Sequence, residues 1–229
     1  MSFTYLLIDF FTIIIPFIYS FHPKLRFYKT WRAFFPAVLI TGLIFILWDV
    51  YFTGLGVWGF NPRYLIGVMV GNMPLEEILF FLCIPYACVF TFHCLDLWIK
   101  NGISKAFEGV LTPAFIAIFL VVAITYHDKI YPMVTFAGLS LLLILAKYVL
   151  KISWLAKFYV IYSILLIPFL IVNGMLTGTG LEEPVVWYNP QKIIGFRILT
   201  IPIEDTFYGM GLILSNLMIY KYLKKLSHH

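Results

Sequence analysis

The amino-acid sequence predicts an all-α bundle of about seven transmembrane helices. Hydrophobic residues make up 62% of the 229 residues, and charged residues only 12%. A soluble protein of this length needs far more charge to cover its surface. Apolar runs of about 17 to 25 residues recur along the chain, which is the length needed to cross a bilayer core. The chain is therefore expected to be an integral membrane protein.

An internal repeat at a constant offset of 128 residues is the second observation behind this fold class. The motif P-x-E-[E/D]-x-x-[F/Y] occurs twice, and in each copy an Asn-Pro pair, a glycine and a tryptophan precede it. The members of the two copies are Trp58, Asn61, Pro62, Gly67 and Pro74, then Trp187, Asn189, Pro190, Gly195 and Pro202, with one residue of slippage at the tryptophans. Four elements at fixed spacing indicate a duplicated unit.

Seven spans account for the apolar runs in order. They are expected at about residues 5–20, 33–49, 73–98, 111–126, 134–150, 158–172 and 203–220. The run from Tyr64 to Trp98 is too long for one span, since 35 residues of helix measure about 52 Å. Pro74 is the natural break because proline removes a backbone donor. A short interfacial or re-entrant helix is therefore expected over 63–72.

The domain organisation follows from the repeat. The first span shifted by 128 residues falls on the fifth, so the predicted units are a first repeat over 1–98, a connector span over 99–130 and a second repeat over 131–229. The connector restores the direction of the second copy. The two copies should then be related by a pseudo-two-fold axis along the membrane normal, with both acidic motifs on the same side.

Lysine and arginine concentrate in the loops after spans one, three and five and after span seven. By the positive-inside rule these loops are cytoplasmic, which predicts an outside N-terminus, a cytoplasmic C-terminus and acidic motifs in the non-cytoplasmic half. The expected location is a bacterial inner membrane. Membrane topology also accounts for the net charge of +5, so no nucleic-acid partner is expected. An oligomer is left open.

Four carboxyl groups lie within apolar spans: Glu76, Glu77, Glu204 and Asp205. Each costs about 2.5 to 3.5 kcal/mol to insert, and such groups normally mark function. An alternative is that the first acid of each pair stabilises a helix N-terminus. That alternative does not explain why each copy holds two acids.

Desolvation and neighbouring carboxylates favour the protonated form of buried acids. A protonated carboxylic acid in a dry pocket can donate a proton to an apolar substrate, and aromatic faces can stabilise the resulting cation. We predict the four acids as catalytic groups. The candidates for substrate binding are Asp49, Trp58, Phe60, Asn61, Phe80, Asn189 and Tyr208. Other polar residues have plainer expected roles: Arg63 and Arg197 as partners of acids or headgroups, His93 as a packed side chain, and Asp9, Asp96 and Asp128 as interfacial groups.

These motifs resemble the small integral-membrane lycopene cyclases, both the two-subunit bacterial type and its fused single-chain relatives. The resemblance rests on the segments 48–49, 52–53, 56–61, 75–81 and 84–86 and on the second copy at 201–208, and it covers nearly the whole chain. It implies an isomerase-type cyclisation of linear lycopene ends to β-rings: a terminal double bond is protonated, an internal one attacks the cation, and a proton leaves. Relatives that cyclise longer carotenoids or make ε-rings leave the product open, as does mono- versus bicyclisation.

The rival functions fit the sequence less well. An intramembrane prenyltransferase needs D-x-x-x-D motifs, which are absent from the sequence. A proton-coupled transporter also uses buried acids, but here the charge is concentrated in one pair of motifs. A flavin-dependent cyclase would need a dinucleotide fingerprint. We therefore expect no cofactor, and also no metal, because ionised carboxylates around a metal would leave no proton for the alkene. The three cysteines read as buried thiols.

Overall fold

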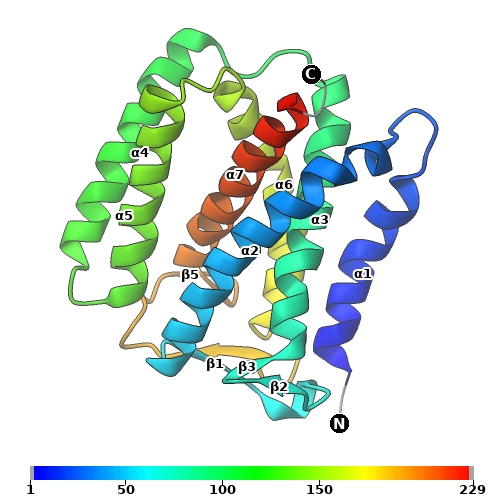
Figure 1. Ribbon diagram of the computed structural model, residues 1–229. Coiled ribbons are helices and arrows are strands. Elements are labelled where there is room, and N and C mark those ends of the chain that lie inside the picture. The colour runs from blue at the N-terminus through cyan, green and yellow to red at the C-terminus, as the bar shows by residue number, and fades with distance from the viewer. Residues whose placement is uncertain (1–2, 227–229) are drawn as a thin grey trace.

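The computed structural model describes residues 3–226 and confirms the all-α bundle (Figure 1). Within that range seven α-helices run roughly along one direction: α1 Thr4–Tyr19, α2 Trp31–Gly54, α3 Leu75–Trp98, α4 Lys105–Thr125, α5 Ile130–Ile144, α6 Leu155–Leu176 and α7 Ile203–Leu226. The helices α2 to α6 are long and apolar enough to cross a membrane. A π-helical turn, η3 Leu145–Val149, extends α5. Short 3-10 turns, η1 Phe27–Thr30 and η2 Pro62–Tyr64, precede α2 and follow the first strand.

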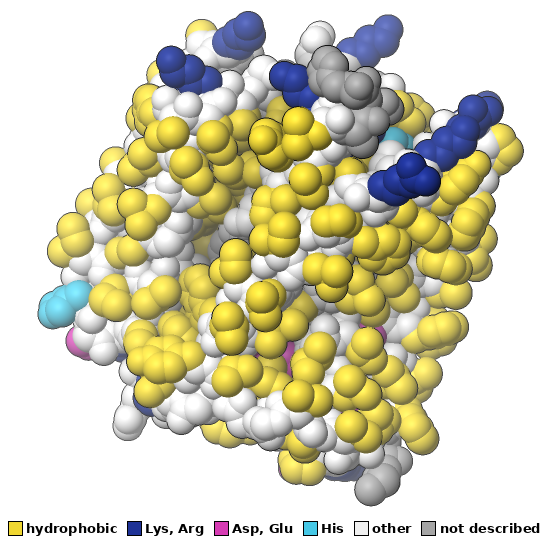
Figure 2. Space-filling view, viewed as in Figure 1, with side chains coloured by type: hydrophobic (Ala, Val, Ile, Leu, Met, Phe, Trp, Pro, Cys, Tyr) yellow, Lys and Arg dark blue, Asp and Glu magenta, His cyan; other side chains and the backbone are white. Residues whose placement is uncertain are grey.

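The outer surface is that of a membrane protein. Hydrophobic side chains cover the face in Figure 2 from end to end, while most of the visible lysine and arginine side chains lie at the end where α7 finishes. Apolar residues such as Leu39, Phe11 and Ile167 are more than 60% exposed. Lipid tails are as apolar as these side chains, so their exposure costs nothing in a bilayer.

The loop before each acidic motif forms a β-hairpin. The strands are β2 Met69–Val70 with β3 Met73–Pro74, and β5 Arg197–Ile198 with β6 Ile201–Pro202. The expected short helix over 63–72 was therefore wrong. Gly67 and Gly71 have φ of 87° and 64°, values that break a right-handed helix and suit turns. A 3-10 turn and a hairpin fold this segment back over the helix start.

The repeat is confirmed contact by contact. The amide of Leu75 donates to Val68 O at 2.9 Å, and the amide of Ile203 donates to Phe196 O at 3.0 Å. The second hydrogen bond joins the residues that lie 128 positions after those of the first. The glycines Gly67 and Gly195 share positive φ values of 87° and 95°. Both copies therefore build the same start for their third helix.

A two-stranded sheet joins the two copies. Strand β1, Trp58–Phe60, pairs antiparallel with β4, Val186–Tyr188, and Gly59 lies opposite Trp187 at the centre. Gly59 and Trp187 are themselves equivalent by the 128-residue offset, so Trp58 is not the counterpart of Trp187. A side chain at Gly59 would overlap the Trp187 indole. The centre of this strand pair therefore has room for one bulky residue, and the second copy supplies it.

The packing departs from this symmetry on one side of the bundle. Helix α2 packs closely along α7, whereas the equivalent pair α6 and α3 makes fewer contacts. Because proteins seldom leave space between helices without a use for it, the looser pair marks where a site is expected.

The hairpin tips give a first prediction. Leu199 has φ of 57° and occupies the position of Gly71, and its side chain is 72% exposed. A left-handed conformation costs a non-glycine residue about 1–2 kcal/mol. Leu199→Gly should therefore raise the free energy of unfolding by about 0.5–1 kcal/mol after the entropy of glycine is counted. Thermal unfolding in detergent measures this, and Gly71→Leu should move the midpoint the opposite way.

Candidate active site

A cavity of about 670 Å³ lies within the bundle, between α1, α3, α6 and α7. Its wall is mostly apolar, but three carboxylic side chains line it: Asp49 of α2, Glu77 of α3 and Asp205 of α7. Side chains of α1 and α6 that line the cavity are also exposed on the flank of the bundle, among them Phe11, Ile15 and Ile171 at 62–66%. The cavity therefore opens sideways, between α1 and α6.

Glu77 forms a pair with Asp49. Both side chains line the cavity, and Asp49 Oδ2 has no hydrogen-bond partner among the described residues. Tyr5 of α1 donates its hydroxyl to Glu77 Oε2 at 2.5 Å, and the Trp58 indole N–H donates to Asp49 Oδ1. Two neighbouring carboxyl groups in an apolar wall repel each other when both are ionised. The first copy thus presents two neighbouring carboxyl groups at the cavity wall.

Asp205, the equivalent of Glu77, has different partners. Tyr131 of α5 donates to Oδ1 at 2.6 Å, while Tyr188 and Asn173 donate to Oδ2 at 2.8 and 3.0 Å. A carboxylate can accept at both oxygens, so these three donors would stabilise the charge if Asp205 is ionised. The second copy thus presents a carboxyl group that accepts three hydrogen bonds.

Aromatic rings fill the space between the two acids. The Trp58 ring centroid lies 5.0 Å from that of Tyr131 and 6.0 Å from that of Tyr188. Tyr208 stands 6.3 Å from Tyr131 and 5.3 Å from Trp48. The ring faces carry partial negative charge, so this part of the cavity suits a cation.

Glu76 and Glu204 do not line the cavity, contrary to the expectation that all four acids meet there. Both are fully buried, and each accepts a backbone N–H from its own loop: Ile66 N at 2.6 Å from Glu76 Oε1, and Ile194 N at 2.5 Å from Glu204 Oε1. Consecutive helical residues point about 100° apart, so only one acid of each pair can face the cavity. The first acid fastens the loop, and the second faces the cavity.

Among the other predicted residues, Trp58, Phe60, Phe80 and Tyr208 line the cavity, whereas Asn61 and Asn189 do not. Each asparagine accepts a backbone N–H two residues later at 3.0 Å, from Arg63 and Gln191 respectively. The two asparagines therefore cap turns. The structure places them in the loops at the end of the bundle.

The predicted arginine partners also lie in those loops. Arg63 forms an exposed ion pair with Glu182 at 2.6 Å. Arg197 donates to Thr200 O at 2.5 Å and lies over the Tyr188 ring. Neither arginine bonds to a cavity acid. Their contacts hold loop segments together.

Sequence reasoning missed the hydrogen-bond donors of the site, Tyr5, Tyr131, Tyr188 and Asn173. Tyr5 and Tyr131 each donate to the second acid of their own copy, but they lie two residues off the 128-residue offset, and Tyr188 and Asn173 have phenylalanine at the equivalent positions, so the offset did not indicate them. Asp9 was expected at the interface, but it is only 2% exposed and lies beside Glu76 and Glu77. Neither of its carboxyl oxygens has a hydrogen-bond partner among the described residues. The burial of Asp9 follows from its position one helical turn after Tyr5, on the face of α1 that packs against α3.

Comparison with known proteins gives one match. A family model described as lycopene cyclase matches residues 2–95 and 128–223, which together contain both acidic motifs. The matched segments leave out the whole of helix α4. No curated protein and no solved structure matches the chain.

Proposed function

This chain belongs to the lycopene cyclase family, and we propose that it converts linear ends of lycopene to β-rings by proton transfer inside the cavity. The supporting observation is the unequal hydrogen bonding of two matched acids. Glu77 has a second carboxyl group, Asp49, beside it and accepts from Tyr5, whereas Asp205 accepts from three donors. One acid is thus suited to give a proton and the other to receive one.

The reaction begins at the Glu77–Asp49 pair. Its proton passes to a terminal double bond of the substrate, which becomes a tertiary carbocation. Loss of the proton leaves both carboxyl groups ionised, and Tyr5 and Trp58 stabilise these charges by hydrogen bonds. A preorganised set of donors is worth most in a site that excludes water. Tyr5 and Trp58 are therefore positioning residues for the acid.

The reaction ends at Asp205. An internal double bond attacks the cation, the ring closes, and the positive charge moves to a ring carbon. The Asp205 carboxylate stabilises that charge and takes the proton that leaves, assisted by the faces of Trp58, Tyr131 and Tyr208. One proton enters the substrate and one leaves it, so electrons balance and no redox cofactor is a reactant. The proton must then return to the Glu77–Asp49 pair before the next cycle.

The cavity also suits a long apolar substrate that arrives from the bilayer. Its lining runs along α3 from Glu77 to Thr91, a length of about 21 Å at 1.5 Å per residue. A carotenoid end can slide between α1 and α6 with its tip at the acids and its polyene along α3. We place the basic end of the bundle at the cytoplasm by the positive-inside rule, which puts the acids near the outer surface.

The test is a single turnover in D₂O. Purified protein in detergent, in excess over lycopene and with a chelator present, should form cyclic product carrying one non-exchangeable deuterium in each new ring. Product without deuterium would contradict protonation by a side chain that exchanges with solvent. Loss of activity with chelator, restored by Mg²⁺, would contradict the acid mechanism. Expression in a lycopene-accumulating bacterium, with pigment analysis, identifies the ring type.

A further inference from the structure

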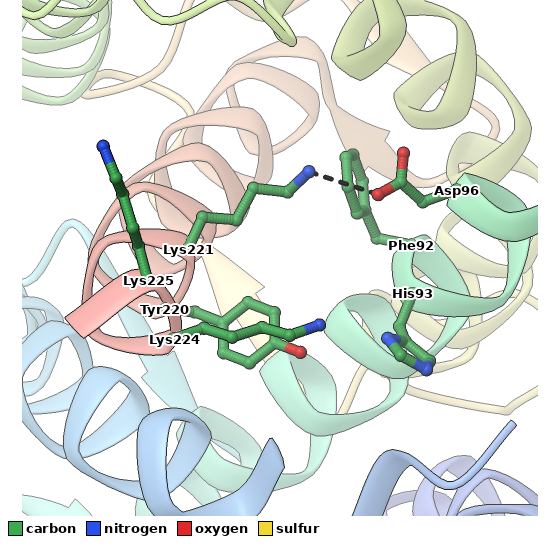
Figure 3. Close-up of a pocket in the computed structure, with 7 residues that line it drawn as sticks. All are labelled: Phe92, His93, Asp96, Tyr220, Lys221, Lys224 and Lys225. Carbon is green, nitrogen blue, oxygen red and sulfur yellow. Dashed lines mark hydrogen bonds and ion pairs between the residues drawn. The ribbon is translucent and has the colours of Figure 1, made fainter. Parts of the chain in front are cut away.

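A second pocket, of about 270 Å³, lies at the other end of α3 and α7 from the acids (Figure 3). Its wall comes from the last turns of these two helices, with Phe92, His93 and Asp96 on α3 and Tyr220, Lys221, Lys224 and Lys225 on α7. This pocket shares no lining residue with the cavity. The proposed cyclisation does not use it.

The pocket carries an excess of positive charge. Three lysines line it, but Asp96 is the only acid in its wall. Asp96 is already held by two cations, since Lys157 Nζ lies 2.7 Å from Oδ1 and Lys221 Nζ lies 3.3 Å from Oδ2. His93 bonds Leu25 O at 2.8 Å through Nε2. The wall therefore carries three lysine side chains and one aspartate.

The ammonium groups are also held in place. Lys221 Nζ lies 4.7 Å from the Phe92 ring centroid and 4.9 Å from that of Trp154. In Figure 3 the amino groups of Lys221 and Lys224 both point into the space between α3 and α7, and Lys225 points away from it. Cation–π contacts reduce the side-chain freedom that binding would otherwise cost. The pocket is therefore organised before a ligand arrives.

We propose that this pocket binds the phosphate of an anionic phospholipid. The pocket lies at the end of the apolar belt, close to Trp98 and Tyr222, which are 74% and 64% exposed. Tryptophan and tyrosine exposed at helix ends mark the headgroup level of a membrane. Basic pockets between helices on the cytoplasmic side suit anionic headgroups. The rings of Phe92 and Tyr220 give the apolar glycerol region a surface that a free phosphate ion does not need.

The experiment measures phosphatidylglycerol bound to the full chain by native mass spectrometry, with thermal unfolding in phosphatidylcholine nanodiscs as a second readout. Wild-type protein should retain phosphatidylglycerol and unfold at a higher temperature as its content rises. Lys224→Gln should weaken binding about fivefold, the contribution of one lysine that contacts an anionic headgroup. Lys24→Gln removes equal charge from an exposed position outside the pocket, where no headgroup is held, and should change binding less than about twofold.

Three results would overturn the proposal. Equal weakening in the Lys224→Gln and Lys24→Gln variants would mean that diffuse surface charge attracts the lipid. Unchanged binding in the Lys224→Gln variant would mean that the headgroup lies elsewhere. Inorganic phosphate that raises the unfolding temperature as much as phosphatidylglycerol at equal concentration would assign the pocket to a soluble anion.

Discussion

Glu77→Gln should abolish ring formation while the protein remains inserted and folded. The amide keeps the shape of the side chain and still accepts from Tyr5, but it holds no acidic proton for the alkene. A general acid contributes about 10²- to 10⁴-fold to a rate, so cyclisation should fall by about 10³-fold or more. Pigment analysis in lycopene-accumulating cells, followed by single-turnover rates of purified protein, measures the loss.

The matched control is the neighbouring residue, Glu76→Gln. Its amide retains a carbonyl oxygen that can accept the N–H of Ile66, which is the contact the structure gives Glu76. Cyclisation should therefore stay within about threefold of wild type, well below the loss expected for removal of a general acid. If Glu76→Gln were as inactive as Glu77→Gln, the assignment of the acid to the cavity-facing position would be wrong.

Asp205→Asn should also suppress cyclisation, for a different reason. The substitution removes the negative charge that faces the cation and the base that receives the leaving proton. Loss of one preorganised electrostatic group costs about 10²- to 10³-fold. Substrate binding should persist, because the cavity keeps its volume and its apolar wall. Absorbance changes of lycopene on binding separate retained binding from lost chemistry.

In Asp205→Asn the new amide N–H₂ group faces the donors Tyr188 and Asn173, which lose an acceptor. The free energy of unfolding of the variant must therefore be measured separately from its activity. Thermal unfolding of Asp205→Asn and of Glu204→Gln provides the comparison. Glu204 bonds only its loop in the structure, so Glu204→Gln should keep its activity. An Asp205→Asn protein that folds normally and cyclises at the wild-type rate would remove Asp205 from the mechanism.

Much of this architecture could be predicted because the sequence contains it twice. Apolar runs give the spans, and the 128-residue offset gives the pairing of equivalent elements. Local backbone geometry was harder, as the segment between Pro62 and Pro74 illustrates. Its apolar composition favours a helix, but Gly67 and Gly71 adopt positive φ and turn it into a hairpin. A single sequence does not reveal which of its glycines uses that freedom.

The acids of the site were predictable as a group but not individually. Pro-x-Glu-Glu in an apolar run indicates carboxyl groups whose burial costs free energy, which points to a function. The direction in which each side chain points, however, depends on where the helix starts. The hairpin fixes that start at Leu75, which turns Glu77 toward the cavity and Glu76 toward Ile66. The tyrosines that decide the character of each acid come from α1, α5 and β4. No local pattern links these distant segments to the motif.

The single tryptophan at the centre of the β1–β4 pair bears on how such a protein can evolve. In a dimer of identical halves every substitution appears twice, so a tryptophan at the Gly59 level would meet its own copy across the axis. Joining the halves in one polypeptide removes that constraint, and each half can then change alone. The glycine opposite the indole records one such change. The same freedom allows the different hydrogen-bond partners of Glu77 and Asp205, on which the proposed division of labour rests.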